Sequence, residues 1–326
     1  MQNPAWIAVG ARACKGWTGG PFIGREYAEF TDLFKTQAAD ACETLQPLLT
    51  PRLVAKSNLA ARLSTALIGV PLIMGMLFVG PAQGWFALVG VVVCFASWEL
   101  FSMTHPEDRL ARAVCCLSSA ATFVVLCQFS SSPRALVCLL FLVPLVGMLL
   151  PLWRLGKIDT AGLRIMAGVG GPFYVGGLFA PIAMLRMQWG ESGGGLVLLT
   201  LTFAWGADTG GYFFGRFLGR RKLYEAISPK KTVEGFWGAL VGAVVGGLVV
   251  RFTLLPAIPI LHLILLGIVA GALGQLGDLV ESLLKRSTGI KDSGSLLPGH
   301  GGILDRVDAL LLVGPVVLLY LTMIGG

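Results

Sequence analysis

The chain has 326 residues, of which 55% are hydrophobic and only 13% are charged. Soluble domains usually carry about a quarter charged residues, so this composition excludes an ordinary soluble domain and indicates a protein of the lipid bilayer. The formal net charge of +7 could suggest a nucleic-acid partner, but the cations collect in loops between apolar segments, so we expect no nucleic-acid binding.

The seven cysteines and three histidines do not form a recognisable metal or redox motif. No pair of cysteines has CxxC spacing, and five of the seven fall within apolar segments. We therefore expect thiols that are buried as small hydrophobic groups.

Residues 1–57 are predicted to be an N-terminal extension, partly helical or disordered. No continuous apolar stretch follows Arg12 and Lys15, so a secretory signal peptide is not expected. Between Tyr27 and Leu45 apolar residues recur at helical spacing among mainly acidic charges, which argues against binding to anionic lipid. Because every polar motif described below lies beyond this extension, we expect it to be non-catalytic.

Apolar segments then follow one another to the end of the chain, most of them near the ~20 residues that span a bilayer. They are nine in number and cover residues 62–80, 85–103, 113–129, 135–153, 165–185, 196–214, 236–252, 257–276 and 303–323. This pattern predicts an all-α polytopic membrane protein with about nine transmembrane helices and a cytoplasm-facing polar cavity. The glycines of 165–185 fit either close helix packing or a broken helix, and close packing is favoured.

Lysine and arginine predict the orientation of these segments, because cytoplasmic loops are enriched in both. With the N-terminus inside, the outer loops hold only Arg134, Arg186 and Arg251. The inner loops and their edges hold Arg109, Arg112, Arg154, Lys157, Arg164, Arg216, Arg220, Arg221, Lys222, Lys230, Lys231, Lys285, Arg286, Lys291 and Arg306. An odd number of spans then places the C-terminus outside.

The first of two polar stretches runs from Asp208 to Gly235, at an inner end. An acid within an apolar segment is a functional candidate, although an ion pair with Arg216 would also explain Asp208. Further on, a loop is expected to present the hydroxyls and cations of Ser228, Pro229, Lys230, Lys231 and Thr232. These groups suit phosphate oxygens and also suit simple positive-inside anchoring, so the residues alone leave both interpretations open.

The second polar stretch runs from Ser282 to Asp308, and Asp278 and Glu281 lie just before it, at the end of the eighth apolar segment. Asp278, Glu281 and Ser282 have helical spacing and share one face, as do Asp305 and Asp308 on a helix expected to begin near Ile303. The glycines before that helix leave backbone N–H groups free, where an anion is stabilised. Carboxylates for a metal, with cations and N–H groups for phosphate, predict a site for a metal–phosphate complex.

This second stretch resembles the signature of the phosphatidate cytidylyltransferase (CDP-diacylglycerol synthase) family. The matching residues are Ser282, Leu284, Lys285, Arg286, Lys291, Asp292, Gly294, Leu297, Pro298, His300, Gly301, Gly302, Asp305, Arg306, Val307 and Asp308. The resemblance covers about 58–326 and includes a similar motif at the first polar stretch. This chain departs from the family at Ala309, where Ser is usual, and at Gly211 and Val233, where Ala and Trp are common.

The resemblance implies condensation of CTP with phosphatidate to CDP-diacylglycerol and pyrophosphate. It implies Mg²⁺, with a second monovalent or divalent ion left open, and metal ligands at Asp278, Asp305 and Asp308. The implied catalytic set adds Lys285, Arg286 and His300, where His300 is either a base or a neutral, hydrogen-bonded side chain. The implied substrate- and phosphate-binding residues are Asp208, Arg216, Ser228, Lys230, Lys231, Thr232, Glu234, Ser282, Lys291, Asp292, Gly301, Gly302 and Arg306.

The resemblance also implies a homodimer. We expect membrane lipid as a partner and the bacterial inner membrane as the location, and the distribution of lysine and arginine predicts that the active site faces the cytoplasm. Glu99 matches an acid of the family and has no assigned role; structural pairing is the favoured interpretation.

Three other functions remain to be compared with this interpretation. A CTP-dependent polyprenol or phytol kinase shares the apolar architecture but transfers a different phosphoryl group. An ion transporter would need ionisable groups along a whole path, whereas here they gather at the inner ends. A non-catalytic scaffold would not need the ordered signature.

Overall fold

The computed structural model describes residues 67, 69–294 and 301–324. The chain divides into two units, Met1–Leu63 and Ser64–Gly326, and the described residues all belong to the second. The predicted extension and Leu297, Pro298 and His300 of the signature therefore lie outside the described residues.

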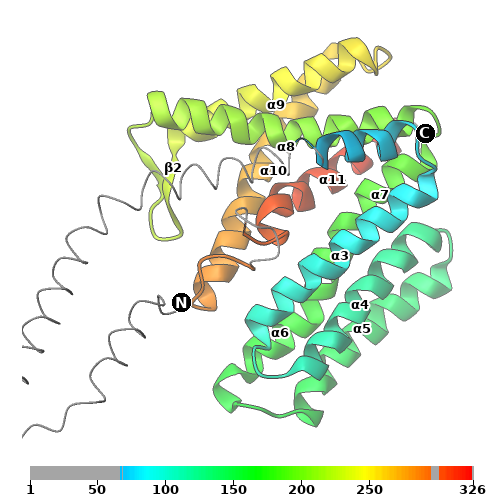
Figure 1. The fold of residues 1–326 in the computed structure, drawn as a ribbon, viewed down its shortest axis with the longest axis vertical. Helices are drawn as coiled ribbons and strands as arrows, with labels where there is room; N and C mark the ends of the chain where they lie inside the picture. Colours follow the sequence, from blue (N-terminus) through cyan, green and yellow to red (C-terminus); the bar gives the residue numbers. More distant parts are fainter. Residues whose placement is uncertain (1–66, 68, 295–300, 325–326) are drawn as a thin grey trace, which may run out of the picture. The chain divides into compact units, whose positions relative to one another are not determined.

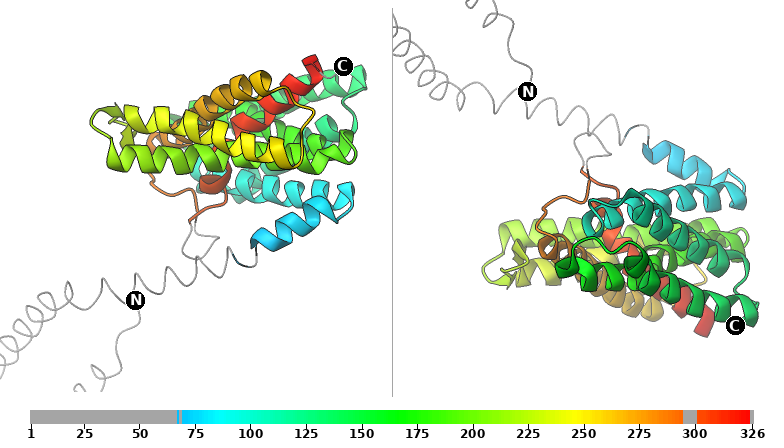
Figure 2. Two further views of the ribbon diagram at one scale, coloured as in Figure 1. Left: turned by 90° about the horizontal axis from the view of Figure 1, so that it is seen from above. Right: turned by 90° about the horizontal axis from the view of Figure 1, so that it is seen from below.

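The described unit is built almost entirely from helices that lie side by side (Figures 1 and 2). A short helix, Gly69–Phe78, comes first. It is followed by α3 (Ala82–Thr104), α4 (Arg109–Gln128), α5 (Pro133–Trp153), η2 (Ile158–Thr160), α6 (Ala161–Pro172), η3 (Phe173–Gly177), α7 (Leu178–Gln188), α8 (Ser192–Phe217), β1 (Lys222–Tyr224), β2 (Ser228–Thr232), α9 (Val233–Thr253), α10 (Ile260–Ser287) and α11 (Leu304–Ile324). The predicted all-α architecture is confirmed.

Short polar side chains fix where several of these helices begin. Asp108 accepts a hydrogen bond from the N–H of Ala111 at the start of α4, at 3.0 Å. Thr232 does the same for the N–H of Gly235 at the start of α9, at 3.1 Å. Such N-caps satisfy backbone donors that have no partner within the helix, and they stop the helix from extending into the preceding loop.

Seven helical segments of the described residues are long and apolar enough to cross a membrane. The predicted count of nine is not confirmed. The described part of 62–80 contributes the short helix Gly69–Phe78, and 196–214 lie in α8, which is not one of the seven. α8 is 26 residues long, but its glycines and Asp208 lower its hydropathy.

The glycines of 165–185 support close packing, as favoured from the sequence. A Cβ on Gly176 would lie 2.1 Å from the carbonyl oxygen of Ser119, and one on Gly171 would lie 2.7 Å from the ring of Phe101. The segment is not broken, because α6, the π-helical turn η3 and α7 form one continuous run, Ile158–Gln188. The π turn directly follows Pro172, which cannot donate a backbone hydrogen bond.

α8 and α9 pack closely and are joined by a β-hairpin (Figure 1). A Cβ on Gly210 or on Gly242 would lie 2.1 Å from a carbonyl oxygen of the facing helix. The expected loop from Ser228 to Thr232 was wrong: this segment is strand β2, which pairs with β1 through Lys222–Thr232 and Tyr224–Ser228. The strand carries Lys231 back towards α10.

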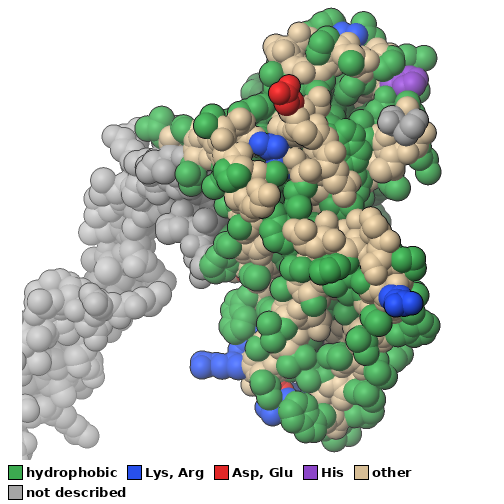
Figure 3. Space-filling model, turned by 90° about the vertical axis from the view of Figure 1, so that its right-hand side faces the viewer, with side chains coloured by type: hydrophobic (Ala, Val, Ile, Leu, Met, Phe, Trp, Pro, Cys, Tyr) green, Lys and Arg blue, Asp and Glu red, His purple; other side chains and the backbone are tan. Residues whose placement is uncertain are grey.

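The surface of this unit suits lipid. Large apolar side chains are exposed along the helices; on α5, for example, Leu140 and Phe141 are 61% and 68% exposed. The face drawn in Figure 3 is covered mainly by hydrophobic side chains, with few charges. Exposed apolar area on this scale would be an aggregation hazard in water and is normal in a bilayer. Of the described cysteines Cys115 and Cys127 are buried as expected, whereas Cys94 and Cys138 are exposed.

Candidate active site

A polar cavity of about 170 Å³ lies where α8, the hairpin, α9 and α10 meet. It brings the first polar stretch together with Asp278, the carboxylate that directly precedes the second polar stretch. Its lining consists of Asp208, Gly211, Tyr212, Gly215, Lys230, Lys231, Thr232, Gly235, Gln275 and Asp278. Ligand pockets commonly measure 300–1,000 Å³, so a cavity of this size suits the phosphate part of a substrate.

Lys231 connects the hairpin to α10 inside this cavity. Its Nζ lies 2.7 Å from Oδ2 of Asp278 and donates to the carbonyl oxygen and the Oε1 of Gln275, at 3.2 and 3.1 Å. Ser282 donates its hydroxyl to Oδ1 of Asp278 at 3.3 Å, so the helical face predicted for these two residues is confirmed. The amine and the carboxylate are both partly exposed to the cavity.

Three carboxylates from three helices gather around Lys231. Asp278 of α10 interacts electrostatically with Asp208 of α8 and with Asp308 of α11, and Asp208 and Asp308 also interact with each other. Lys231 acts on both, and Arg306 acts on Asp208. Of these three carboxylates, Asp278 is the one that forms a direct ion pair with Lys231. We call Asp208, Asp278 and Asp308 the acidic cluster. Neighbouring like charges disfavour one another's ionised form unless a cation compensates them.

The carboxylate oxygens of the acidic cluster are of the ligand type that a hard divalent cation such as Mg²⁺ prefers. Proteins usually supply Mg²⁺ with one or two carboxylates, together with substrate phosphates. Within the described residues no three His, Cys, Asp or Glu side chains converge on one metal position, and Asp278 is turned towards Lys231. The donor set therefore suits a metal that substrate phosphates help to hold, rather than an all-protein cage.

Asp305 belongs to a different group from the one the signature implies. Its Oδ1 lies 2.6 Å from Nζ of Lys285, and Lys285 also forms an ion pair with Glu281 one turn earlier on α10. Oδ2 of Asp305 accepts the backbone N–H groups of Ser293 and Gly302 at 3.1 and 3.0 Å. Lys285 thus forms ion pairs with two nearly buried carboxylates, Glu281 of α10 and Asp305 of α11, and links these two helices.

The start of α11 differs from the expectation of free N–H groups. The N–H of Ile303 donates to Oε1 of Glu99 at 2.9 Å and that of Leu304 to Oε2 at 2.8 Å, while Gly302 donates to Asp305. α11 begins at Leu304, close to the predicted Ile303. The anion at this helix start is therefore a side chain of the protein itself. Glu99 has the structural pairing that the sequence analysis favoured, with partners that the sequence did not reveal.

Several residues expected to bind phosphate have structural partners. Thr232 caps α9, and Glu234 accepts the N–H groups of Arg220 and Arg221 at 2.9 and 3.2 Å, which fixes the turn before the hairpin. Arg216 donates to the hydroxyl of Tyr212. In the described part of the chain the ion pairs do not include Arg216 with Asp208, so the structural explanation offered for Asp208 is not supported.

The remaining candidates lie towards solvent. Lys230, Lys291, Asp292 and Arg306 are exposed, and Arg286 is exposed with a long contact of 3.5 Å to the carbonyl oxygen of Ile290. Ser228 is half-buried within β2. Gly301 has φ +80°, a left-handed conformation that favours glycine, and its amide precedes the turn that Asp305 closes.

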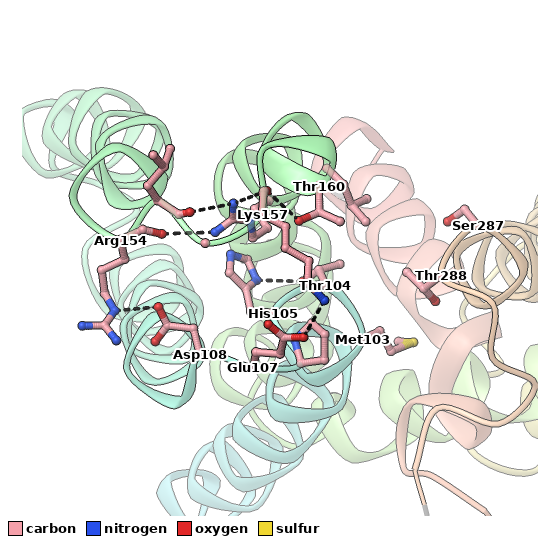
Figure 4. A pocket seen from close by; sticks show the side chains of 15 residues that line it. Met103, Thr104, His105, Glu107, Asp108, Arg154, Lys157, Thr160, Ser287 and Thr288 are labelled. Atoms are coloured by element: carbon pink, nitrogen blue, oxygen red, sulfur yellow. Dashed lines mark hydrogen bonds and ion pairs between the residues drawn. The ribbon is translucent and has the colours of Figure 1, made fainter.

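A second, larger cavity of about 600 Å³ lies at the same end as the C-terminus of α10 (Figure 4). It is lined by the α3–α4 and α5–α6 connections and by Ser287 and Thr288. Four of its charges occur in pairs: Arg154 Nε lies 2.6 Å from Asp108 Oδ2, and Lys157 Nζ lies 2.8 Å from Glu107 Oε1. Arg164, which also lines the cavity, donates to the backbone carbonyl oxygens of Arg154, Leu155 and Lys157. The hydrogen bond from Arg154 holds the pKa of Asp108 below its usual value, whereas burial lowers the pKa of His105 to about 4. Because its cations are either paired with carboxylates or bonded to backbone carbonyl oxygens, this cavity is a weaker candidate for anionic substrates.

The fold and this site together define a helical protein of the membrane, with carboxylates and lysines gathered at one end of its helices. The chain belongs to the cytidylyltransferase family, whose sequence profile matches residues 60–324. It is 34% identical to the phosphatidate cytidylyltransferase of Synechocystis over 291 residues, which is 81% of this chain and 96% of the relative. It is 33% identical to that of Pseudomonas aeruginosa over 276 residues, or 79% and 95%. The match to that of Bacillus subtilis is 52% identical over 111 residues and spans 34% of this chain and 41% of the relative.

Proposed function

We propose that this protein transfers the cytidylyl group of CTP to phosphatidate, giving CDP-diacylglycerol and pyrophosphate for phospholipid biosynthesis. The observation that carries the proposal is the acidic cluster beside Lys231, at a phosphate-sized cavity in a chain of the cytidylyltransferase family. The relatives named phosphatidate cytidylyltransferase supply the substrate class.

The reaction places particular demands on the protein. A phosphate oxygen of phosphatidate forms a bond to the α-phosphorus of CTP, and the bond from that phosphorus to the bridging oxygen of the β-phosphate breaks, so pyrophosphate leaves with the electron pair. Both reactants are anionic, so positioning and charge neutralisation carry most of the catalysis. Lys231, held by Asp278 and Gln275, and the exposed Lys230 beside it are placed to contact phosphate oxygens.

Mg²⁺ is part of the proposal. Asp278 and Asp308, with Asp208 beside them, would hold it, and the bound ion would neutralise charge on the phosphates and the leaving group. Asp305 is the third ligand that the family resemblance implies; to reach a metal it would have to give up Lys285. A second ion, monovalent or divalent, remains a proposal on the resemblance alone.

The location is proposed to be the bacterial inner membrane, with the site facing the cytoplasm. The loop that carries Arg154 and Lys157 lines one cavity together with Ser287 at the end of α10, and the acidic cluster lies at this same end of α10 and at the start of α11. The positive-inside rule then puts the site on the cytoplasmic side, where nucleoside triphosphates are. A homodimer is proposed from the family resemblance alone.

The function can be tested with purified protein in detergent, supplied with CTP, Mg²⁺ and phosphatidate. We expect CDP-diacylglycerol and pyrophosphate in equal amounts, and no product when diacylglycerol replaces phosphatidate, because it lacks the attacking phosphate. Asp159→Asn is a matched control, because Asp159 is exposed in η2, outside the acidic cluster. Phosphorylation of a lipid alcohol, in place of cytidylyl transfer, would favour the kinase instead.

A further inference from the structure

Glu99 is a nearly buried carboxylate that joins two segments about 200 residues apart in the chain. It lies on α3 and is only 6% exposed. Its oxygens accept hydrogen bonds from the hydroxyl of Ser293 at 3.1 Å and from the N–H groups of Ile303 and Leu304 at 2.9 and 2.8 Å. Among the described residues no lysine or arginine forms an ion pair with it, so these neutral donors compensate its charge.

These donors are the ones that a helix start leaves without partners. The first N–H groups of an α-helix cannot bond within the helix, and the helix dipole adds partial positive charge there. A residue just before the helix normally supplies the cap, but here Gly302 and Ile303 have no acceptor in their side chains. Asp305 closes the turn locally through the N–H of Gly302, and Glu99 caps the next two N–H groups from another helix.

The surrounding backbone has room for this carboxylate only because it carries glycine. A Cβ on Gly302 would lie 2.0 Å from Oγ of Ser293 and 2.5 Å from Oε2 of Glu99, and a Cβ on Gly294 would lie 2.6 Å from Oε1. Two signature glycines therefore approach one side chain of α3 more closely than any other residue type could. Close approach to Glu99 gives a physical reason for glycine at these positions that is separate from substrate binding.

We propose that Glu99 is a positioning residue, which fixes the first turn of α11 and thereby the place of Asp308 relative to Asp278. Leu304 and Asp308 are one helical turn apart, so a shift at the capped end moves the Asp308 carboxylate. Displacements of about 1 Å in a catalytic arrangement can reduce rates by about 10²-fold. The inference deepens the proposed function, and its kinetic part rests on that function.

Hydrogen–deuterium exchange of the full chain in detergent tests the contact without any substrate. Glu99→Gln keeps the volume but turns an amide donor towards groups that are donors already. We expect faster exchange at Ile303 and Leu304, with α4 and α5 unchanged. Glu107→Gln is the matched control, because the Glu107 side chain is 73% exposed and its ion-pair partner among the described residues is Lys157; it should change neither exchange at α11 nor turnover.

Kinetics then separate positioning from simple stability. We expect Glu99→Gln to lower kcat at least tenfold with little change in KM for CTP, and Glu99→Asp, which keeps the charge, to retain more activity. Ser293→Ala removes one hydrogen-bond donor to Glu99 and should lower kcat by a smaller factor. This variant tests the proposal if Glu99→Gln does not fold. Unchanged exchange at Ile303 and Leu304, equally faster exchange in all helices, or normal kcat despite local exchange would each overturn the proposal. If the parent protein lacks cytidylyl transfer, the proposed function fails while the exchange result still decides the contact.

Discussion

Asp305 and Asp308 are three residues apart in one helix, yet the structure predicts opposite effects of the same substitution on stability. Asp308 accepts a hydrogen bond from the N–H of its neighbour Ala309, at 2.8 Å, and interacts electrostatically with Asp278, Asp208 and Lys231. Asp308→Asn removes a like charge from the acidic cluster, so thermal stability should stay the same or rise. Asp305→Asn weakens contacts to Lys285, Ser293 and Gly302. Hydrogen bonds to charged groups contribute about 1.5–3 kcal/mol each, so its free energy of unfolding should fall by roughly that amount.

Turnover should respond differently from stability. If Asp308 holds Mg²⁺ against two anionic substrates, Asp308→Asn removes several kcal/mol of charge stabilisation. A loss of about 3 kcal/mol corresponds to roughly 10²-fold in rate, and extra Mg²⁺ should rescue it only weakly. We also expect Asp305→Asn to lower turnover about 10²-fold, but in this variant the free energy of unfolding should fall as well.

The assay is thermal unfolding in detergent beside CTP turnover at saturating CTP and Mg²⁺, with Asp159→Asn as the control. The prediction is refuted if Asp308→Asn keeps a rate within about tenfold of the parent and its unfolding temperature falls as far as that of Asp305→Asn. Both carboxylates would then be structural residues of the start of α11.

Three further predictions follow from the fold. A periplasm-specific reporter fused after Gly326 should be active, because α11 starts at the cavity end and its 21 residues cross about 30 Å; activity from a cytoplasm-specific reporter instead would contradict the orientation. Asp108→Ala should lower the free energy of unfolding by about 1 kcal/mol through the lost cap of α4, while Asp108→Asn keeps the cap. Because Arg154 holds the pKa of Asp108 low, this carboxylate's charge-dependent contribution should be complete above about pH 4 and disappear as the pH falls through the lowered pKa, as a chemical-denaturation series would show. Gly242→Ala should destabilise the protein by about 1–3 kcal/mol, because its Cβ would meet the Gly206 carbonyl oxygen at 2.1 Å, whereas Gly170→Ala, with nothing within 4 Å, should be tolerated in the same unfolding assay.

The helices themselves were predictable, because apolar runs near the length of a bilayer leave the backbone few alternatives. The polar stretches were predictable for the same reason: Asp208 and Asp278 are conspicuous in an apolar sequence. What hydropathy did not fix was the number of spans. Residues 196–214 form part of a long helix that is rich in glycine and carries Asp208, so length and hydropathy disagree there.

Periodicity indicates which side chains share a helix face, but not which helix that face meets. It placed Asp278 and Ser282 together and also Asp305 and Asp308. It could not show that Asp305 would form an ion pair with Lys285. This contact separates Asp305 from the other two predicted metal ligands, Asp278 and Asp308. The contacts of Glu99 were harder to predict, because its hydrogen-bond donors lie about 200 residues away in the chain. Local sequence patterns do not indicate contacts over such a separation. The available signals were an acid in an apolar segment and its match to an acid of the family.

The fate of the phosphorus atoms of CTP tests the central claim most directly. Purified protein is incubated with Mg²⁺ and phosphatidate, in parallel with CTP labelled at the α- or at the γ-phosphorus, and the lipid is extracted. Cytidylyl transfer predicts that the α-label enters the lipid and that the γ-label stays in water as pyrophosphate. A γ-label in the lipid, or no transfer of the α-label, would contradict the account.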